Sequence, residues 1–204
     1  MADQETGRIE AFSDGVFAVA ITLLVLDLHV PALKDAPLGL FKALEGQWPA
    51  LAAYVVSFLT ILVMWLNHHR LFEQIRRKDH LLMIYNGLLL MLVTLIPFPT
   101  ALVAAYIRTP DAKIAAVLYC GLNLLMALAF NLLWNHAARD GRLLAADHDM
   151  HRVHHITQQY RFGPILYAAA FALAFISVNA CVGLIGLLAV FFALPEHEAK
   201  IVSE

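Results

Sequence analysis

The sequence predicts an all-α, polytopic membrane protein: a six-transmembrane-helix bundle with its N- and C-termini in the cytoplasm. Of its 204 residues, 61% are hydrophobic, and the mean hydropathy is +0.70, whereas soluble domains are nearer half apolar. Only 15% of the residues are charged, against about a quarter in soluble domains. The apolar residues also gather in long runs, most of them near the roughly 20 residues that cross a bilayer. We expect residues 1–204 to form one membrane domain.

Six apolar runs mark the expected helices. They cover approximately residues 9–29, 49–72, 80–107, 113–136, 162–178 and 180–194. Pro97 and Pro99 interrupt the third run and predict a kink there, because proline lacks an amide hydrogen and frees a carbonyl group. The fifth and sixth runs are short, and little more than Asn179 separates them. They form either a tight hairpin or one long tilted helix.

The basic residues indicate the orientation of the chain. With a cytoplasmic N-terminus and six spans, ten of the 14 Lys and Arg residues lie on the cytoplasmic side, as the positive-inside rule requires. This predicts a multi-pass protein of the cell membrane. The first residues, MADQETGRIE, carry no cationic run, so we expect a retained tail rather than a signal peptide. The net charge of −2 argues against nucleic acid as a partner.

The first apolar run is unusually rich in polar and small residues. Its polar positions are Ser13, Asp14, Thr22 and Asp27. Because a carboxylate in hydrocarbon costs several kcal/mol, we expect protein rather than lipid to surround this helix. At about 100° per residue, Val19, Leu23 and Leu26 form one narrow stripe with Thr22 beside it. Such a stripe is typical of ordinary packing, and it also fits apolar rings around a symmetry axis, which gate a pore by dewetting.

Polar residues near the end of the second run and the start of the third are candidate partners for Asp14. The second run ends in WLNHHRLF, and the third begins with RKDHLLMIYN. Buried polar groups need hydrogen-bond partners. We therefore expect Ser13 and Asp14 to form a network with His68 and Asn86 that holds the first helix in place. A purely structural role is the simpler interpretation, because polar contacts between membrane helices are common.

The ten histidines are many for a chain of this length. Candidates for a metal site or a pH sensor lie in one loop, at Asp147, His148, His151, His154 and His155. Their spacing matches no known metal motif, so a solvated loop is the simpler interpretation, and we predict neither a metal site nor a cofactor. The two cysteines lie in apolar runs and are interpreted as small buried hydrophobic residues.

About the first hundred residues resemble the transmembrane protein 175 family of potassium channels. That family has an Arg, three further residues and Phe-Ser-Asp, followed by a Thr-Leu-Leu run; a Trp and a His mark its second helix. The residues that carry the resemblance here are Arg8, Phe12, Ser13, Asp14, Thr22, Leu23, Leu24, Leu26, Trp65, His68, Asn86 and Pro97. Beyond Arg108 the resemblance rests on the number of helices.

The resemblance implies a potassium-permeable cation channel without the Thr-Val-Gly-Tyr-Gly filter loop of ordinary potassium channels. A chain with one six-helix repeat resembles the prokaryotic members, which assemble as homotetramers. The family's pore is lined by the first helix, with a hydrophobic constriction seven residues after the motif Phe, at Val19 here. The neighbouring pore positions are Thr22, Leu23 and Leu26, and K⁺ is the expected permeant ion.

The other motif residues, Arg8, Phe12 and Trp65, are assigned to the polar network around Asp14. Asp27 lies near the outer end of the first helix. A ring of four such carboxylates would concentrate cations at the pore mouth, and a solvated helix terminus is the alternative interpretation.

Two other classes of function compete with a channel. An ion- or proton-coupled secondary transporter would use Asp14 or Asp27, and it predicts inverted repeats that the sequence does not display. An enzyme needs a convergent nucleophile or metal site, and no motif offers one, so we predict no enzymatic activity. The expected partners are further copies of the chain, the lipid bilayer and monovalent cations.

Overall fold

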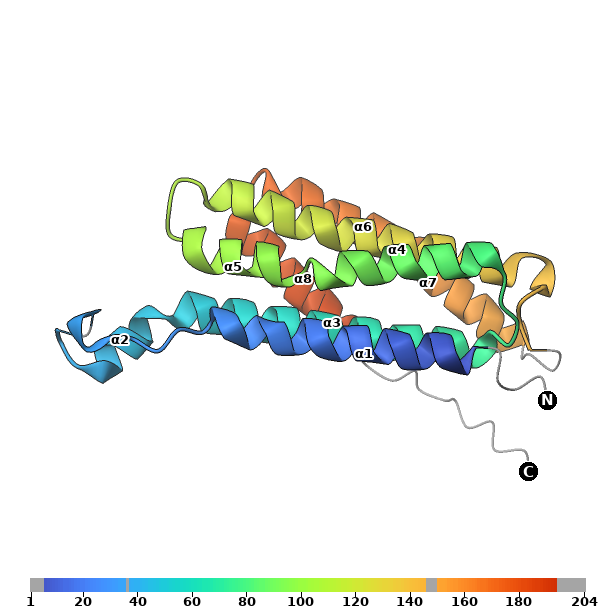
Figure 1. Cartoon of the computed structure of the whole chain (residues 1–204). Coiled ribbons are helices and arrows are strands. Elements are labelled where there is room, and N and C mark those ends of the chain that lie inside the picture. Colours follow the sequence, from blue (N-terminus) through green and yellow to red (C-terminus); the bar gives the residue numbers. More distant parts are fainter. Residues whose placement is uncertain (1–5, 36, 146–149, 194–204) are drawn as a thin grey trace, which may run out of the picture.

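The computed structural model describes residues 6–35, 37–145 and 150–193, and its regular structure there is helical apart from one isolated bridge (Figure 1). The helices are α1 (Gly7–Leu23), α2 (Leu40–Gly46), α3 (Trp48–Gln74), α4 (His80–Thr94), α5 (Pro97–Tyr106), α6 (Ala112–Ala138), α7 (Met150–Ala174) and α8 (Val178–Ala193). Short 3₁₀ turns are η1 (Leu24–Asp27), η2 (Leu33–Asp35) and η3 (Arg139–Gly141). The predicted all-α class is confirmed.

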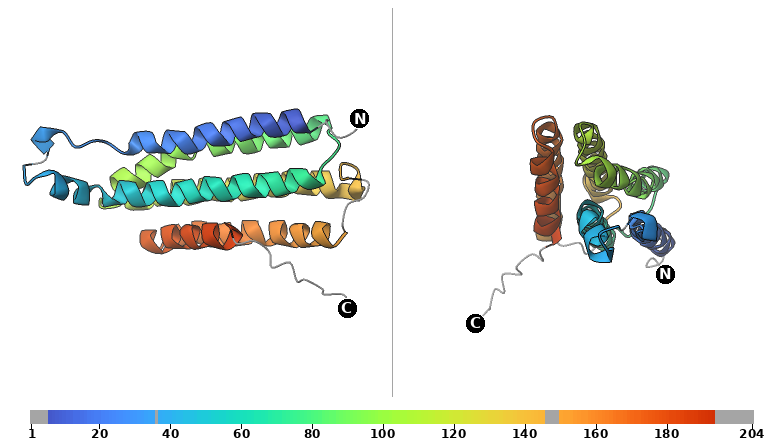
Figure 2. Two further views of the ribbon diagram at one scale, coloured as in Figure 1. Left: turned by 90° about the horizontal axis from the view of Figure 1, so that it is seen from below. Right: turned by 90° about the vertical axis from the view of Figure 1, so that its left-hand side faces the viewer.

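The long helices lie side by side in one bundle, and α2 projects beyond one end of it (Figures 1 and 2). α1 packs against α3 and α4, while α6 packs against α4, α5, α7 and α8. One buried apolar cluster joins α1, α3, α4 and α6, and a second joins α3, α5, α6, α7 and α8. α7 and α8 form a hairpin in which the ring of Tyr167 stacks on that of Phe192, with centroids 6.3 Å apart.

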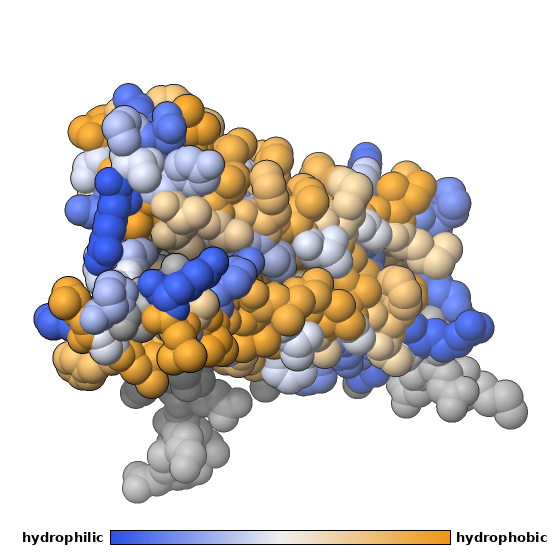
Figure 3. Space-filling view, turned by 60° about the vertical axis from the view of Figure 1, so that its left-hand side comes forward, coloured by the Kyte–Doolittle hydropathy of each residue, from blue (hydrophilic) through white to orange (hydrophobic). Residues whose placement is uncertain are grey.

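Among the described residues, four segments are long and apolar enough to cross a membrane: Gly7–Asp27, Trp48–Gln74, His80–Tyr106 and Ala112–Gly141. In the view of Figure 3, hydrophobic side chains cover much of the flank between the two ends of the bundle. These observations support a multi-pass membrane protein. The apolar helix α8 has 16 residues, and the count of six spans stays a prediction.

The fifth helix begins earlier than expected. Its apolar part starts near residue 162, but α7 already begins at Met150. Hydropathy marks where a helix is apolar, whereas the polar stretch before Phe162 contains neither Gly nor Pro to end a helix. Between α7 and α8 the chain leaves the helical conformation, so a hairpin forms rather than one long helix.

The third apolar run is divided at its prolines into α4 and α5. Pro97 cannot donate a hydrogen bond to the carbonyl of Val93, and the second proline likewise frees the carbonyl of Leu95. The backbone N–H of Ile96 donates to Val93 at 3.1 Å, and that of Phe98 donates to Leu95 at 3.1 Å. These tighter bonds satisfy both carbonyls inside the chain, which a membrane interior requires.

A second proline is accommodated by a side chain of the neighbouring helix. Pro164 lies inside α7 and leaves the carbonyl of Tyr160 without its helical donor. The side-chain amide of Asn131 on α6 donates to that carbonyl at 2.8 Å. On the same side of α6, the Trp134 indole N–H donates to the Thr157 hydroxyl at 2.9 Å. α6 therefore supplies the polar groups that keep α7 in register.

Two loops distant in sequence are joined at the end of the bundle where α3 meets α4. The backbone N–H groups of Arg76 and Arg77 donate to the carbonyl of Leu143 at 2.9 and 3.1 Å. Ile75 pairs with Leu144 in the isolated antiparallel bridge, and both side chains are buried. This pairing fixes the start of α4 relative to the end of α6.

Candidate functional site

α1 has one face against the protein and one face open on the subunit surface. Its buried residues, together with the first residue of η1, are Ser13, Phe17, Ala20 and Leu24. On the other side, Val19 is 55% exposed, Leu23 41% and Leu26 68%. Only 22% of the α1 span is buried, against 39–50% of the other three. The expectation that protein surrounds this helix is therefore not met within one chain.

A directed chain of hydrogen bonds fastens the buried face of α1. The Ser13 hydroxyl donates to the carbonyl of Ile9 at 2.8 Å and accepts from the side-chain amide of Asn86 at 3.0 Å. With its nitrogen facing Ser13, Asn86 presents its oxygen to Nε2 of His68, 2.9 Å away. Nε2 must therefore carry the hydrogen, because an amide oxygen only accepts. The structure thus brings together Ser13, His68 and Asn86 from α1, α3 and α4.

Asp14 has a different partner from the expected one. The Trp65 indole N–H donates to its carboxylate at 2.8 Å, and no hydrogen bond joins Asp14 to His68 or Asn86. The Trp65 ring also stacks on that of His69, with centroids 6.1 Å apart. The expected four-residue network is therefore two separate contacts between α1 and its neighbours, one buried and one exposed.

Arg8 and Phe12 do not join the polar network to which they were assigned. Both lie on the exposed face of α1, and Phe12 is 67% exposed. They are one helical turn apart and continue the open face that holds Val19 and Leu23. In a single chain both are surface residues, and their part in the network stays a prediction.

The remaining candidate pore residues lie toward the other end of the helix. The Thr22 hydroxyl donates to the carbonyl of Val19 at 2.9 Å, so its oxygen lone pairs stay available on the open face. In η1, Asp27 is half-buried, and its Oδ2 atom is covered without a hydrogen-bond partner in the described part of the chain. The carboxylate of Asp27 is therefore not freely solvated in the single chain.

Sequence reasoning missed a second buried polar chain, between α3, α5 and α6. The Thr100 hydroxyl donates to the carbonyl of Ile96 at 2.8 Å, so it accepts from Ser57, 2.7 Å away. Ser57 in turn accepts from the hydroxyl of Tyr119 at 3.1 Å. Polar positions in otherwise apolar runs were the available signal. These hydrogen bonds tie α5 to α3 and α6 directly after the proline break.

Asp79 and His136 form a further contact that the sequence did not predict. Asp79 caps α4 by accepting from the backbone N–H of Leu82 at 2.8 Å, and Nε2 of His136 lies 2.8 Å from its other oxygen. The N–H of Leu82 first, and then His136, hold the pKa of Asp79 below its usual value. This contact reinforces the link between the start of α4 and the end of α6.

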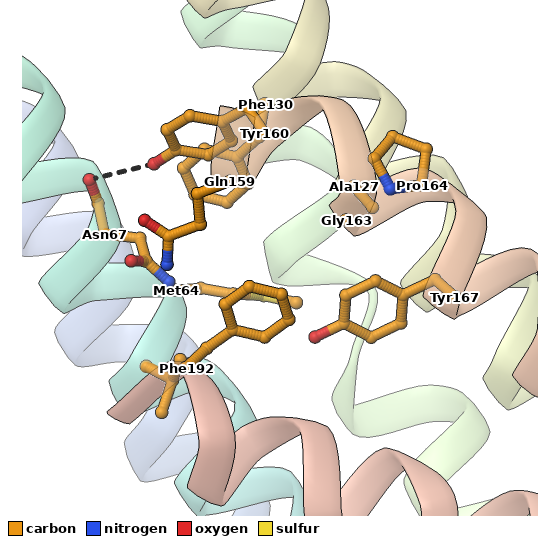
Figure 4. A pocket seen from close by; sticks show the side chains of 11 residues that line it. Met64, Asn67, Ala127, Phe130, Gln159, Tyr160, Gly163, Pro164, Tyr167 and Phe192 are labelled. Carbon is orange, nitrogen blue, oxygen red and sulfur yellow. Dashed lines mark hydrogen bonds between the residues drawn. The ribbon is translucent and has the colours of Figure 1, made fainter. Parts of the chain in front are cut away.

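One pocket between the helices is too small to hold a substrate. It has a volume of about 50 Å³ between α3, α6, α7 and α8 (Figure 4), whereas ligand sites usually measure about 300–1,000 Å³. The Tyr160 hydroxyl reaches across it to the carbonyl of Asn67 at 3.3 Å. The described residues contain no group of three or more metal-ligating side chains, but the candidates Asp147 and His148, and the side chains of His151 and His155, lie outside them. The absence of a metal site therefore stays a prediction.

These features define a multi-pass helical membrane protein whose motif-bearing first helix leaves its apolar stripe open. Residues 8–97 match the family described as endosomal/lysosomal potassium channel TMEM175. A potassium channel of Chamaesiphon minutus is 57% identical over 95% of this chain and 96% of its own length, and one of Streptomyces collinus is 46% identical over 96% and 97%. The chain belongs to the TMEM175 family, which confirms the resemblance.

A solved structure supports the same conclusion. The crystal structure of a lysosomal potassium-selective channel TMEM175 homolog from Chamaesiphon minutus matches this fold with a TM-score of 0.85 and 54% sequence identity. The match covers 92% of this chain and 96% of the crystallised one. It extends the resemblance beyond the N-terminal motif to the packing of the later helices.

Proposed function

We propose that this chain is a potassium-permeable cation channel that assembles as a homotetramer, with the open face of α1 lining a central pore. The observation that carries the proposal is the exposure of Val19, Leu23 and Leu26 on the least buried of the four spans. Homologues described as potassium channels over nearly the whole chain support the same function.

Each residue of the open face has a distinct role in this proposal. Four copies of Val19 form the narrowest ring, where a pore lined by methyl groups loses its water and closes. Leu23 and Leu26 form further apolar rings toward the outer end. The Thr22 hydroxyl has its hydrogen engaged with the helix backbone, so it offers lone pairs to a partly dehydrated cation in place of water oxygens.

Asp27 supplies negative charge at the outer mouth. Four half-buried carboxylates around the axis attract cations and raise their local concentration. The contacts of Ser13, His68 and Asn86 hold α1 at the angle that turns its stripe toward the axis. Asp14 and Trp65 support the same helix from its exposed side, so these polar residues position the pore helix rather than bind the ion.

The membrane topology of the proposal is six crossings with both termini in the cytoplasm. α7 and α8 form the fifth and sixth crossings, and the excess of basic residues fixes the orientation in the cell membrane. No enzymatic step and no cofactor are part of this function.

Ion flux through purified protein in liposomes tests the proposal. We expect K⁺ efflux above that of empty liposomes, unitary current steps in planar bilayers, and increased leak in the Val19→Ala variant. Val55→Ala is the matched control, because Val55 is 51% exposed on α3. Flux that is unchanged in Val19→Ala removes Val19 from the gate, and saturable transport without unitary steps favours a transporter that uses Asp14 or Asp27.

A further inference from the structure

A second open surface lies beside the proline break, far along the chain from α1. It is a groove of about 580 Å³ between the α4–α5 break, α6 and α7. Its lining is almost entirely apolar and includes Leu95, Phe98, Leu118, Gly121, Leu125 and Phe171. This volume falls within the usual range of ligand sites, about 300–1,000 Å³.

The local sequence explains why the groove exists. The break before Pro97 separates α4 from α5 and leaves Phe98 64% exposed at its edge. On α6, Gly121 has no side chain, and the Phe171 ring lies 3.2 Å from the position that a Cβ atom would occupy there. The Phe171 ring therefore forms part of the groove floor, and Leu118 and Leu125 lie on the rim.

The groove lies at the depth of the hydrocarbon core. Leu95 is near the middle of the span His80–Tyr106, and Leu118 and Leu125 lie within the span Ala112–Gly141. Because the hydrocarbon core is about 30 Å thick and a helix rises about 1.5 Å per residue, these positions lie among lipid tails rather than headgroups.

The described residues that line the groove offer no polar group to a polar ligand. The carbonyls freed by the two prolines are satisfied by Ile96 and Phe98. The nearby hydroxyl of Thr100 is buried and bonded within the bundle. An apolar groove open to a bilayer is filled by hydrocarbon, because water finds no partners there.

Within one chain, the groove and the open stripe of α1 lie on different helices. α1 packs against α3 and α4, whereas the groove is walled by α5, α6 and α7. Figure 2, viewed along the bundle, places α1 away from the α7–α8 hairpin. If the α1 helices surround the central axis, the groove faces outward to the lipid, and to this extent the inference rests on the proposed function.

We propose that the groove binds one acyl chain of a bilayer phospholipid, which lies as a wedge against the α4–α5 break. The chain packs between Phe98 and Leu125 and holds the bend of α5 relative to α6. α5 also contacts η1, the outer end of the pore helix. The bound lipid thus acts on the element that supports the pore mouth.

Two matched variants test this site. Leu125→Trp fills the groove, whereas Leu132→Trp places the same ring on the same face of α6, two helical turns away and outside the groove. Leu125 and Leu132 are 52% and 47% exposed. Each full-length protein is purified in mild detergent, and bound phospholipid is counted by native mass spectrometry. Crystals grown with phospholipid brominated on its acyl chain locate the lipid by anomalous scattering.

We expect the wild type and Leu132→Trp to retain a lipid with bromine in the groove, and Leu125→Trp to lose it. Equal lipid retention by both variants, no bromine signal in the groove, or a neighbouring subunit seated there would overturn the site. K⁺ flux from the same preparations separates the two proposals. Flux with an empty wild-type groove contradicts only the lipid site, and a lipid-filled groove without flux contradicts only the channel.

Discussion

α1 and α6 have similar apolar composition, and they differ in how much of their surface the protein uses. Half of the α6 span is buried, against 22% of the α1 span. α6 contacts four other long helices and supplies the side chains that satisfy α7, whereas α1 is held along one face only. Hydropathy therefore identifies both as membrane spans, but only packing identifies the helix whose outer face is available for a pore.

The largest expected effect concerns the contact that fastens α1. Asn86→Leu removes the acceptor of the His68 N–H and the donor to Ser13. We expect the free energy of unfolding to fall by about 2–3 kcal/mol, because each buried group left without a partner costs about 1–3 kcal/mol. Unfolding in mixed micelles measures this loss. Asn135→Leu is the control, because it removes an exposed hydrogen bond, the one that Asn135 donates to Asn131 on α6 at 2.6 Å. Equal losses in the two variants would contradict the role of the buried hydrogen bonds.

A polar substitution on the exposed faces of α1 and α6 tests the difference between these two helices directly. Leu23 and Leu132 are 41% and 47% exposed. We expect Leu23→Asn to increase K⁺ flux about tenfold, equivalent to a barrier lower by about 1.4 kcal/mol, because an amide hydrates the pore. Leu132→Asn faces lipid, so it should lower stability by about 1–3 kcal/mol without raising flux. Increased flux in both variants would refute the assignment of the faces.

A smaller effect is expected where α6 holds α5. Tyr119→Phe removes the hydroxyl that donates to Ser57 and begins the chain to Ile96. The expected loss of stability is about 1 kcal/mol, the usual net value of one hydrogen bond. Thermal unfolding of the purified variant measures it, and unchanged or increased stability would contradict a stabilising role for this hydrogen bond.

The smallest effect is a dependence of stability on pH. The pKa of Asp79 is lowered in the folded chain, chiefly by the backbone N–H of Leu82. Its contribution is therefore complete above the unfolded pKa of 3.8 and is lost as pH falls through the lower folded value. We expect less than about 1 kcal/mol, because solvent screens this partly exposed pair. Asp79→Asn should remove that part of the pH profile; an unchanged profile would exclude Asp79.

The sequence predicted the parts of the fold that depend on local chemistry. Apolar runs located the first four spans, and Pro97 located the break between α4 and α5. The proximity of Ser13, His68 and Asn86 followed from the rule that buried polar groups need partners. These predictions needed no knowledge of how the helices are rotated about their axes.

The remaining features depend on helix rotation, which local patterns do not specify. Asp14 contacts Trp65 rather than His68 because Ser13 and Asp14 lie on different faces of α1. Ser57 and Tyr119 meet only through the packing of α3 against α6. The long polar start of α7 was missed because hydropathy does not detect a helix outside the apolar region.

The central claim is that the open face of α1 borders water in the assembled protein, and thiol accessibility tests it most directly. Thr22 and Thr94 are both exposed within spans, and each donates to the carbonyl three residues earlier. A charged, water-soluble thiol reagent should reduce the K⁺ current of Thr22→Cys and leave that of Thr94→Cys unchanged. If Thr22→Cys conducts normally and reacts only with a lipid-soluble reagent, α1 faces lipid and the proposed pore is wrong.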